Sequence, residues 1–296
     1  RIAIIDMGTN TFHLLLAALE RGKYTILHKE YEAVKIGMAG INEGVVNVDA
    51  CQRAINAMKK FREIIDNYEI SQVYAFGTSA FRNAKNGVEL AKEIEVLTGI
   101  PVRIINGDEE ADLIFSGIKA AIDLRNEVCL VVDIGAGSVE FIIGNGEYMF
   151  WKQSFEIGGQ RLLEKYQKHD PILPGEIRAL NDYLQDVLSP LLVALGKYKP
   201  GTMIGSSGTF DTLSDIFCIR QKIPRTLDEA ETPLTLEGFY EIYNELVTKN
   251  RRERMNIPGM ISLRVDMIVV ATCLIRFILE RHTFSGIRVS TYSLKE

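Results

Sequence analysis

Two aspartates, Asp6 and Asp133, each stand at the end of an apolar strand and directly before a glycine turn. The stretches that contain them read IIDMGTNTFHLLLA and VVDIGAGSVEFIIG, so residues 8–11 of the first match residues 135–138 of the second. A turn of small residues presents backbone N–H groups and hydroxyls without side-chain bulk, which suits phosphate. A carboxylate beside it suits a hard cation such as Mg²⁺, which commonly shares phosphate oxygens. The repeat therefore predicts a phosphate-handling cleft between two related halves.

A third turn of the same kind, GSSGT at residues 205–209, also follows an apolar strand. Glycine and serine occupy many ordinary tight turns, so one such sequence indicates little. Three of them, each after a strand and two preceded by aspartate, indicate a shared site.

Glu140 lies two residues beyond Ser138, on the strand that follows the second turn. Because strand side chains alternate between faces, Ser138 and Glu140 should project the same way. Asp133 and Glu140 are thus a candidate carboxylate pair for Mg²⁺, and the spacing alone fits an exposed strand carboxylate equally well.

Two further segments carry side chains capable of chemistry. The run NGDEEA at residues 106–111 opens a helix, where acidic residues favour the first turn for electrostatic reasons. That is the simpler interpretation, and the alternative is that one carboxylate is a general base that activates water. The segment FGTSAFR at residues 76–82 ends in Arg82, whose guanidinium is either a bidentate phosphate ligand or a solvated charge.

The bulk composition limits the class of protein. The chain of 296 residues is long enough for two domains, and 47% hydrophobic and 25% charged residues are ordinary for a globular protein. The net charge of -5 argues against diffuse binding to nucleic acid. Four scattered cysteines without C-x-x-C spacing indicate buried thiols in a reducing compartment. We expect neither a leader nor a membrane span, since the longest apolar run, 267–279, is short, and hence a cytoplasmic protein.

The predicted elements form a similar series twice. Strands are expected at 1–6, 12–18, 24–36, 72–76 and 102–105, and again at 128–133, 139–143, 148–156, 202–205 and 287–290. Helices are expected at 48–68, 87–97 and 108–122, from about 160, after 174, and at 209–217, 235–248 and 264–282. This order predicts an α/β protein with mixed sheets and helices on both faces. The polar stretch 123–127 marks the junction of domains 1–124 and 125–296, and 222–235 is the expected mobile loop.

Several longer motifs occur together and in one order along the chain. They are IDMGTNTFH at 5–13, GTSAFRNAKN at 77–86, GDEEADLIFSG at 107–117, VVDIGAGSVEFIIG at 131–144, IGGQRL at 157–162, GSSGT at 205–209, IPGM…RVDMI at 257–268 and VSTYSLKE at 289–296. Together they resemble the exopolyphosphatase / guanosine pentaphosphate phosphohydrolase family, within the sugar-kinase, heat-shock-chaperone and actin superfamily. The resemblance covers nearly the whole chain. It implies two ribonuclease H-like (actin-like ATPase) domains, each with a mixed five-stranded sheet flanked by helices, and an interdomain cleft.

The resemblance also implies roles for individual residues. Glu110, the second glutamate of the Glu-Glu-Ala motif, would be the catalytic base. Asp133 and Glu140 would hold Mg²⁺ or Mn²⁺, with Asp6 as a further candidate ligand. The residues expected to hold successive phosphates are Gly8, Thr9, Asn10, Thr11, Ser79, Arg82, Gly135, Ala136, Gly137, Ser138, Gly205, Ser206, Ser207, Gly208 and Thr209. The family usually has glycine where this chain has Ala136, and alanine fits only if the backbone there is ordinary.

These roles lead to one favoured function and several competitors. The favoured function is that of an exopolyphosphatase, which releases terminal phosphate from inorganic polyphosphate by metal-dependent hydrolysis. The alternative within the family is 5′-phosphohydrolysis of guanosine pentaphosphate. A nucleotide-dependent kinase of the superfamily and a sensor that binds polyphosphate or an alarmone without turnover are further alternatives. The expected partners are therefore these polyanions, with no nucleic acid and no membrane, and a homodimer is one option.

Overall fold

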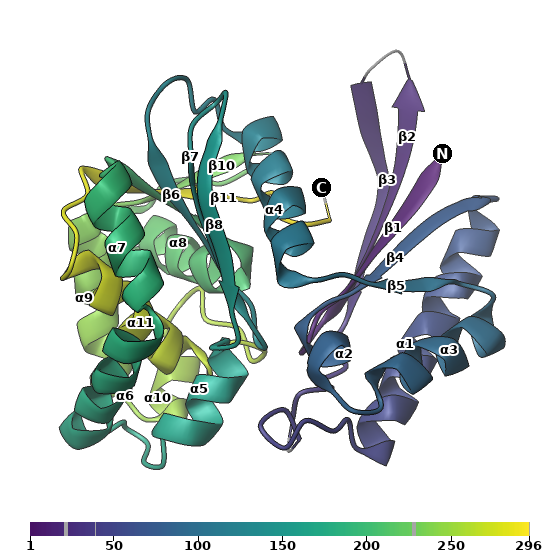
Figure 1. Cartoon of the computed structure of the whole chain (residues 1–296), viewed down its shortest axis with the longest axis horizontal. Helices are drawn as coiled ribbons and strands as arrows, with labels where there is room; N and C mark the ends of the chain where they lie inside the picture. Colours follow the sequence, from purple (N-terminus) through teal and green to yellow (C-terminus); the bar gives the residue numbers. More distant parts are fainter. Residues whose placement is uncertain (21–22, 39, 227–228, 296) are drawn as a thin grey trace. The chain divides into compact units, whose positions relative to one another are not determined.

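The computed structural model describes residues 1–20, 23–38, 40–226 and 229–295. Its contacts divide the chain into two compact units, Arg1–Glu110 together with the segment from Leu294 onward, and Ala111–Ser293. Each unit contains one mixed β-sheet flanked by helices, coloured from purple to blue in the first unit and from teal to yellow in the second (Figure 1). Each therefore has a sheet and a hydrophobic core of its own.

The first unit is built around a five-stranded sheet. β1 (Ile2–Met7), β2 (Phe12–Glu20) and β3 (Lys23–Glu32) form an antiparallel meander, and β4 (Gln72–Gly77) and β5 (Val102–Ile104) extend it in parallel with β1. The strand order is β3-β2-β1-β4-β5. The helices are α1 (Val48–Asn67), α2 (Ser79–Asn83) and α3 (Gly87–Thr98), of which α1 and α3 lie side by side (Figure 1).

Local sequence explains why α1 forms. Asn47 caps the helix by accepting a hydrogen bond from the backbone N–H of Ala50 at 2.8 Å. Met58, Phe61 and Ile65 are buried at spacings of three and four residues, so one face of the helix packs into the core. The helix predicted from this periodicity is therefore confirmed.

The second unit repeats the strand order of the first and adds one edge strand. β6 (Cys129–Ile134), β7 (Val139–Gly144) and β8 (Met149–Phe155) form the meander, and β9 (Thr202–Ser206) and β11 (Gly286–Ser290) continue the sheet in parallel. β10 (Glu231–Leu234) pairs antiparallel with β11, which gives the order β10-β11-β9-β6-β7-β8. The helices are α4 (Gly107–Ala121), α5 (Gly159–Tyr166), α6 (Pro174–Val187), α7 (Ser189–Tyr198), α8 (Ser207–Gln221), α9 (Leu236–Thr248), α10 (Arg251–Met255) and α11 (Ile268–Leu279).

The burial of the second sheet follows from this arrangement. Every residue of β6 and β7 is buried, as expected for central strands covered on both faces. Alternate residues such as Leu130, Val132 and Phe141 enter the main core together with residues of α5 to α9 and α11. At Gly144, the ring of Phe115 on α4 approaches so closely that a Cβ would stand 2.6 Å from it. The sheet is thus packed tightly by the helices around it.

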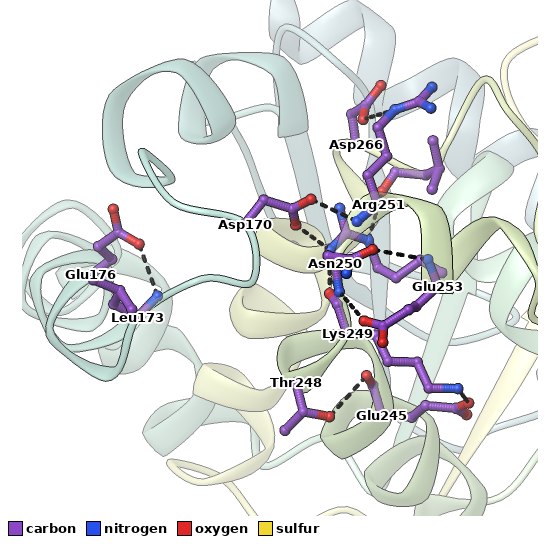
Figure 2. A network of polar contacts seen from close by, with 12 residues as sticks. Asp170, Leu173, Glu176, Glu245, Thr248, Lys249, Asn250, Arg251, Glu253 and Asp266 are labelled. Carbon is purple, nitrogen blue, oxygen red and sulfur yellow. Dashed lines mark hydrogen bonds and ion pairs between the residues drawn. The ribbon is translucent and has the colours of Figure 1, made fainter.

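A buried arginine holds the segments around α9 and α10. The guanidinium of Arg254 donates to the carbonyl oxygens of Lys249 (2.6 Å) and Val265 (3.1 Å) and forms an ion pair with Asp170 (2.6 Å). Asp170 also accepts a hydrogen bond from the backbone N–H of Arg251 (Figure 2). Arg254 is only 1% exposed, and from within the unit it links the distant loop at Asp170 to the segments on both sides of α10.

The predicted fold class is confirmed, since both units have the topology of a ribonuclease H-like (actin-like ATPase) domain. The prediction of five strands in each is wrong for the second unit, whose sheet has six. The additional strand, β10, lies within the stretch 222–235 that was expected to be a loop, and residues 227–228 of that stretch lie outside the described residues. β10 is short and contains proline, which is typical of an edge strand and gives a weak strand signal.

Smaller differences from the predicted elements have local causes. The third strand ends at Glu32 rather than at Ile36, and Lys35 has a positive φ of 47°, which interrupts extended backbone. The late helix starts at Ile268 rather than at Arg264, because turns occupy the preceding residues. The short helices α2 and α10 and the separate helix α7 were not predicted.

Helix α4 runs across the division of the chain. Its residues up to Glu110 cluster with the first unit, and those from Ala111 onward cluster with the second. The predicted division at 124/125 would assign the whole helix to the first domain, and that functional division stays a prediction.

The apolar helix α11 is a core element. It has 12 residues, nearly all of them buried. Across the ranges that the structure describes, no helix combines the length and the apolar character needed to cross a bilayer.

Candidate functional site

The first predicted phosphate turn connects β1 to β2 as a tight hairpin. The N–H of Gly8 donates across the turn to the carbonyl oxygen of Thr11 (3.2 Å). The carbonyl oxygens of the two residues between them accept hydrogen bonds from the N–H groups of Lys35 (2.9 Å) and Gly37 (3.1 Å). The carbonyl oxygens of Thr9, Asn10 and Thr11 are thus engaged within the protein.

Two hydroxyls of this first turn are buried without a partner. Among the described residues, none forms a hydrogen bond with the hydroxyl oxygen of Thr9 or Thr11, although these residues are only 4% and 6% exposed. Buried polar atoms are normally hydrogen-bonded, so unpaired hydroxyls indicate a place for a ligand or water. The acceptor oxygens of a phosphate group match two hydroxyl donors.

The second turn repeats the same backbone geometry between β6 and β7. The N–H of Gly135 donates to the carbonyl oxygen of Ser138 (3.1 Å). The three carbonyl oxygens of residues 135–137 accept hydrogen bonds of 2.9–3.1 Å from the N–H groups of residues 158–160, at the start of α5. Arg161 Nε donates to the last of these carbonyl oxygens as well (2.8 Å). The carbonyl side of this turn is therefore covered by α5.

Ala136 is accommodated in the second turn because its backbone is ordinary. Ala136 does not belong to the described residues that have a positive φ, so the condition for alanine in place of the family's glycine is met. Within the described part of the chain, the N–H groups of Ala136 and Gly137 face no acceptor, which leaves them as donors for an anion. Gly158 is required by packing, since a Cβ there would stand 2.4 Å from the backbone of Ala136.

The two carboxylates predicted to bind a cation are neighbours on the second sheet. Asp133 on β6 and Glu140 on β7 are directly opposite in the antiparallel register, which places both side chains on the same face. They are 5% and 1% exposed, and Ser154 on β8 donates a hydrogen bond of 2.6 Å to Glu140 Oε1. The structure therefore brings this pair together, and neither residue is an exposed strand carboxylate.

Asp6 occupies the equivalent place in the first unit, with different surroundings. Its register partners are His13 on β2 and Phe76 on β4. The corresponding partners of Asp133 are a glutamate and a serine. The register partners of Asp133 therefore carry side-chain oxygen atoms, whereas those of Asp6 do not.

A hard cation fits the Asp133–Glu140 pair. Across the described residues, no group of three or more His, Cys, Asp or Glu side chains could hold a metal ion. Mg²⁺ commonly binds through one or two carboxylates and completes its coordination with water and substrate phosphate oxygens. Two buried carboxylates beside the turn that is predicted to bind phosphate match that requirement.

The third turn differs from the other two because it connects β9 to the helix α8. The hydroxyl of Ser206 donates to Asp133 Oδ2 (2.5 Å), and the hydroxyl of Ser207 lies 2.7 and 2.8 Å from the two carboxylate oxygens of Asp133. Gly205 has a packing role, since a Cβ there would stand 2.0 Å from the ring of Phe210. The side chains of this turn are therefore directed to the predicted metal ligand, and its backbone begins a helix.

The guanidinium of Arg264, a half-buried residue, lies against the first turn of α8. A Cβ at Gly208 would stand 2.2 Å from Arg264 Nη2, so only glycine leaves room for that side chain. Burial lowers the pKa of Arg264 below its ordinary value, and the negative charges of Asp211 and Asp133 act in the opposite direction. A positive charge thus faces Asp133 from the side of the third turn.

Glu110 is the buried carboxylate of the acidic run at the start of α4. It is 7% exposed, and its Oε2 forms an ion pair of 2.9 Å with Arg82 Nη1, which also donates to the carbonyl oxygen of Ile105 (3.0 Å). Glu109 is instead partly exposed and pairs with Arg103. The two neighbouring glutamates of the helix's first turn thus differ in their surroundings. Glu110 is buried beside Arg82, and Glu109 is partly exposed at the surface.

Arg82 and Ser79, both predicted phosphate ligands, lie together on the short helix α2. Arg82 contacts Glu110, so it is a neighbour of the predicted base and not a solvated charge. Ser79 is buried, and its hydroxyl accepts a hydrogen bond from the side-chain amide of Asn83 (3.3 Å). Their contact with phosphate stays a prediction.

Three residues that support these groups were missed from the sequence. Arg161 and Arg264 lie within the motifs IGGQRL and RVDMI, so membership of a motif was the available signal for both. Ser154 had no such signal, because an isolated serine on a strand does not reveal its partner on the next strand.

The order of the turns and carboxylates along the chain corresponds to one group of phosphatases. The model of the Ppx/GppA phosphatase family matches residues 15–296. The chain belongs to this family. Membership of the Ppx/GppA phosphatases confirms the predicted resemblance and the predicted enzyme class, a hydrolase of phosphorus-containing anhydrides.

Individual Ppx/GppA relatives match over most of the chain. The crystal structure of an exopolyphosphatase from Cytophaga hutchinsonii is 43% identical, with a TM-score of 0.97, and the match covers 99% of this chain and 95% of that chain. A Haemophilus influenzae protein with the provisional name exopolyphosphatase is 25% identical over 295 residues, which cover 100% of this chain and 89% of the relative. The bifunctional 3-dehydroquinate synthase/phosphatase of Fusobacterium nucleatum is 30% identical over 292 residues, which cover 94% of this chain and 43% of that protein. The same fold therefore also occurs as part of a longer chain.

Proposed function

We propose that this chain is an exopolyphosphatase that releases terminal phosphate from inorganic polyphosphate by metal-dependent hydrolysis, with water activated by Glu110. The second turn carries the proposal. Its carbonyl oxygens are all engaged, the N–H groups of Ala136 and Gly137 are left as donors, and Asp133 and Glu140 lie side by side next to it. Such a set of donors and carboxylates suits a phosphate chain with its cation.

Each group has a definite task in this reaction. Backbone N–H groups and the hydroxyls of Thr9 and Thr11 bind phosphate oxygens and offset their charge, which is the main contribution of a protein to phosphoryl transfer. Asp133 and Glu140 would hold Mg²⁺ or Mn²⁺, which supplies positive charge to the phosphate oxygens when bound. Water attacks the terminal phosphorus, the bridging P–O bond breaks, and the carboxylate of Glu110 accepts the proton. The guanidinium of Arg82 orients that carboxylate.

The decisive assay measures phosphate release from polyphosphates of several lengths and from guanosine pentaphosphate, with and without Mg²⁺. We expect metal-dependent release from polyphosphate. Release from guanosine pentaphosphate alone would support the 5′-phosphohydrolase alternative. Binding of either polyanion without release under all metals would support a sensor, and labelled products other than phosphate in the presence of ATP and acceptors would support a kinase.

Replacing the proposed base separates catalysis from binding. Glu110→Gln should lower turnover by about 10²- to 10⁴-fold, the usual contribution of a general base, and leave polyphosphate binding largely intact. Glu109→Gln is the matched control, because Glu109 is the adjacent glutamate and pairs with Arg103 at the surface. Equal rates for the Glu110→Gln variant and the wild type would reject the role of Glu110.

A further inference from the structure

Both carboxylate oxygens of Asp133 accept hydrogen bonds from serine hydroxyls. Ser206 contacts Oδ2 at 2.5 Å, and Ser207 contacts Oδ1 at 2.7 Å and Oδ2 at 2.8 Å. Ser206 is the parallel register partner of Asp133 on β9, and it is completely buried. Two consecutive residues at the end of β9 and the start of α8 therefore hold the carboxylate in one orientation.

The backbone of Ser207 makes this contact at a cost in stability. Ser207 has a φ of 68°, the left-handed region in which a residue with a Cβ is strained and glycine is not. The neighbouring turn positions 205 and 208 are glycine, where packing against Phe210 and Arg264 leaves no space for a Cβ. The chain thus has serine at the one position of this turn whose φ favours glycine, so the hydroxyl has a use that offsets the strain.

The first unit provides an internal comparison. Its equivalent aspartate, Asp6, lies beside Phe76 on the parallel strand where Asp133 lies beside Ser206. Phenylalanine offers no hydroxyl. The bond that Ser206 donates to Asp133 therefore has no counterpart from the register partner of Asp6 on β4.

We propose that Ser206 and Ser207 are positioning residues that orient the Asp133 carboxylate for a divalent cation. The proposal rests on the proposed function, since it concerns the cation of that site. Each hydroxyl donates its one proton to the carboxylate, which fixes the rotation of the side chain. Partners that orient a metal-binding side chain typically contribute 10- to 100-fold to metal affinity.

The test compares cation binding and stability in serine variants of the full chain. Binding of Mn²⁺ alone is measured by the loss of the electron paramagnetic resonance signal of the free ion, and stability by thermal melting. We expect Ser206→Ala and Ser207→Ala together to weaken Mn²⁺ binding by about 10- to 100-fold. The Mg²⁺ concentration for half-maximal phosphate release should rise by a similar factor.

The Ser207→Gly variant separates positioning from a structural role. Glycine relieves the positive φ, so the melting temperature should stay constant or rise, while Mn²⁺ binding should still weaken because the hydroxyl is gone. The control is Ser214→Ala, a buried serine of α8 whose hydroxyl donates to the carbonyl oxygen of Pro233 and not to Asp133. That variant should bind Mn²⁺ as the wild type does.

The outcomes distinguish this proposal from the proposed function. Wild-type Mn²⁺ affinity in Ser207→Gly and in the double variant would overturn the positioning role, even if the wild-type chain hydrolyses polyphosphate. A wild-type chain that binds no Mn²⁺ would overturn it as well. Weakened Mn²⁺ binding in the variants, together with a wild type that releases no phosphate, would support the positioning role and reject the exopolyphosphatase activity.

Discussion

The two hairpin turns of the molecule share a backbone and differ in their side chains. In both, the first glycine donates to the carbonyl oxygen three residues later, and a nearby segment donates to the carbonyl oxygens of the two residues in between. The first turn adds the hydroxyls of Thr9 and Thr11, which have no hydrogen-bond partner among the described residues, whereas the second adds the cross-strand pair Asp133 and Glu140. The duplicated fold therefore supplies the same turn geometry twice, and we propose that both turns bind phosphate. The side chains at a few positions differ between the two. They provide hydroxyl donors at the first turn and a pair of carboxylates, a candidate cation site, beside the second.

The segments that cover the two turns also correspond. Gly37 lies close to the first turn, and a Cβ added to it would stand 2.3 Å from Thr9 Cγ2. Gly158 lies equally close to the second turn, and a Cβ added to it would stand 2.4 Å from the backbone of Ala136. The contact atom is a side-chain methyl in the first case and backbone in the second. A Cβ at Gly158 would therefore displace backbone of the second turn, whereas a Cβ at Gly37 would displace a side-chain methyl group.

The largest effect should come from removing the carboxylate of Glu140, which lies on the strand after the second turn and has no equivalent in the first unit. Glu140→Gln should lower phosphate release by about 100-fold or more, because the charge stabilisation supplied by a bound metal is worth several kcal/mol. The matched change in the first unit is His13→Gln, at the equivalent cross-strand position, and it should have a much smaller effect. The measurement is the rate across an Mg²⁺ titration. Equal losses in the two variants would mean that the turns are not specialised.

The difference between these two close contacts can be tested by replacing each glycine with alanine. Gly158→Ala should cost about 1–3 kcal/mol of unfolding free energy, the usual range for overpacking, because the backbone of the turn must move. Gly37→Ala should cost less, since a threonine methyl can shift. Urea unfolding of both variants gives the comparison, and a larger loss from Gly37→Ala would reverse it.

The unpaired hydroxyls make the next prediction. Thr11→Val should weaken substrate binding by about 3- to 10-fold, the equivalent of one hydrogen bond, and leave stability unchanged or slightly higher. Thr98→Val is the control, because that hydroxyl donates to the carbonyl oxygen of Ile94 at 2.7 Å and its loss should reduce stability instead. A clear drop in melting temperature for Thr11→Val would mean that its hydroxyl has a partner within the protein.

The smallest effect is expected at Ala136. Ala136→Gly restores the residue usual in the family and should lower stability by about 0.5–1 kcal/mol, because glycine has more conformational freedom in the unfolded chain. Activity should not change, as Ala136 has an ordinary φ. Calorimetry with a parallel phosphate-release assay checks both points, and a gain in rate would show that the methyl group hinders the substrate.

The parts of the structure that depend on local sequence could be predicted. The hairpins follow from apolar alternation around Asp-x-Gly, and the register of β6 and β7 is set by that pattern, so Asp133 and Glu140 meet as expected. The edge strand β10 could not be predicted, because Glu231–Leu234 acquires its strand character only by pairing with β11.

Contacts between residues that are distant in sequence could not be predicted either. Ser206 lies 73 residues from Asp133, and Arg82 lies 28 residues from Glu110. The motifs placed each of these residues after a strand, but whether a hydroxyl or guanidinium faces a phosphate or a carboxylate depends on tertiary packing. The same holds for Arg264, whose position over α8 depends on the space left by Gly208.

The buried guanidinium of Arg254 has a consequence for local unfolding. It connects the loop at Asp170, the end of α9 at Lys249 and the backbone at Val265, so none of these segments can detach without exposing an unpaired charge or breaking the same three bonds. Such segments should exchange their amide hydrogens as one cooperative group. Val265 is adjacent to Arg264. We therefore expect the same cooperative group of segments to hold the Arg264 guanidinium near Asp133.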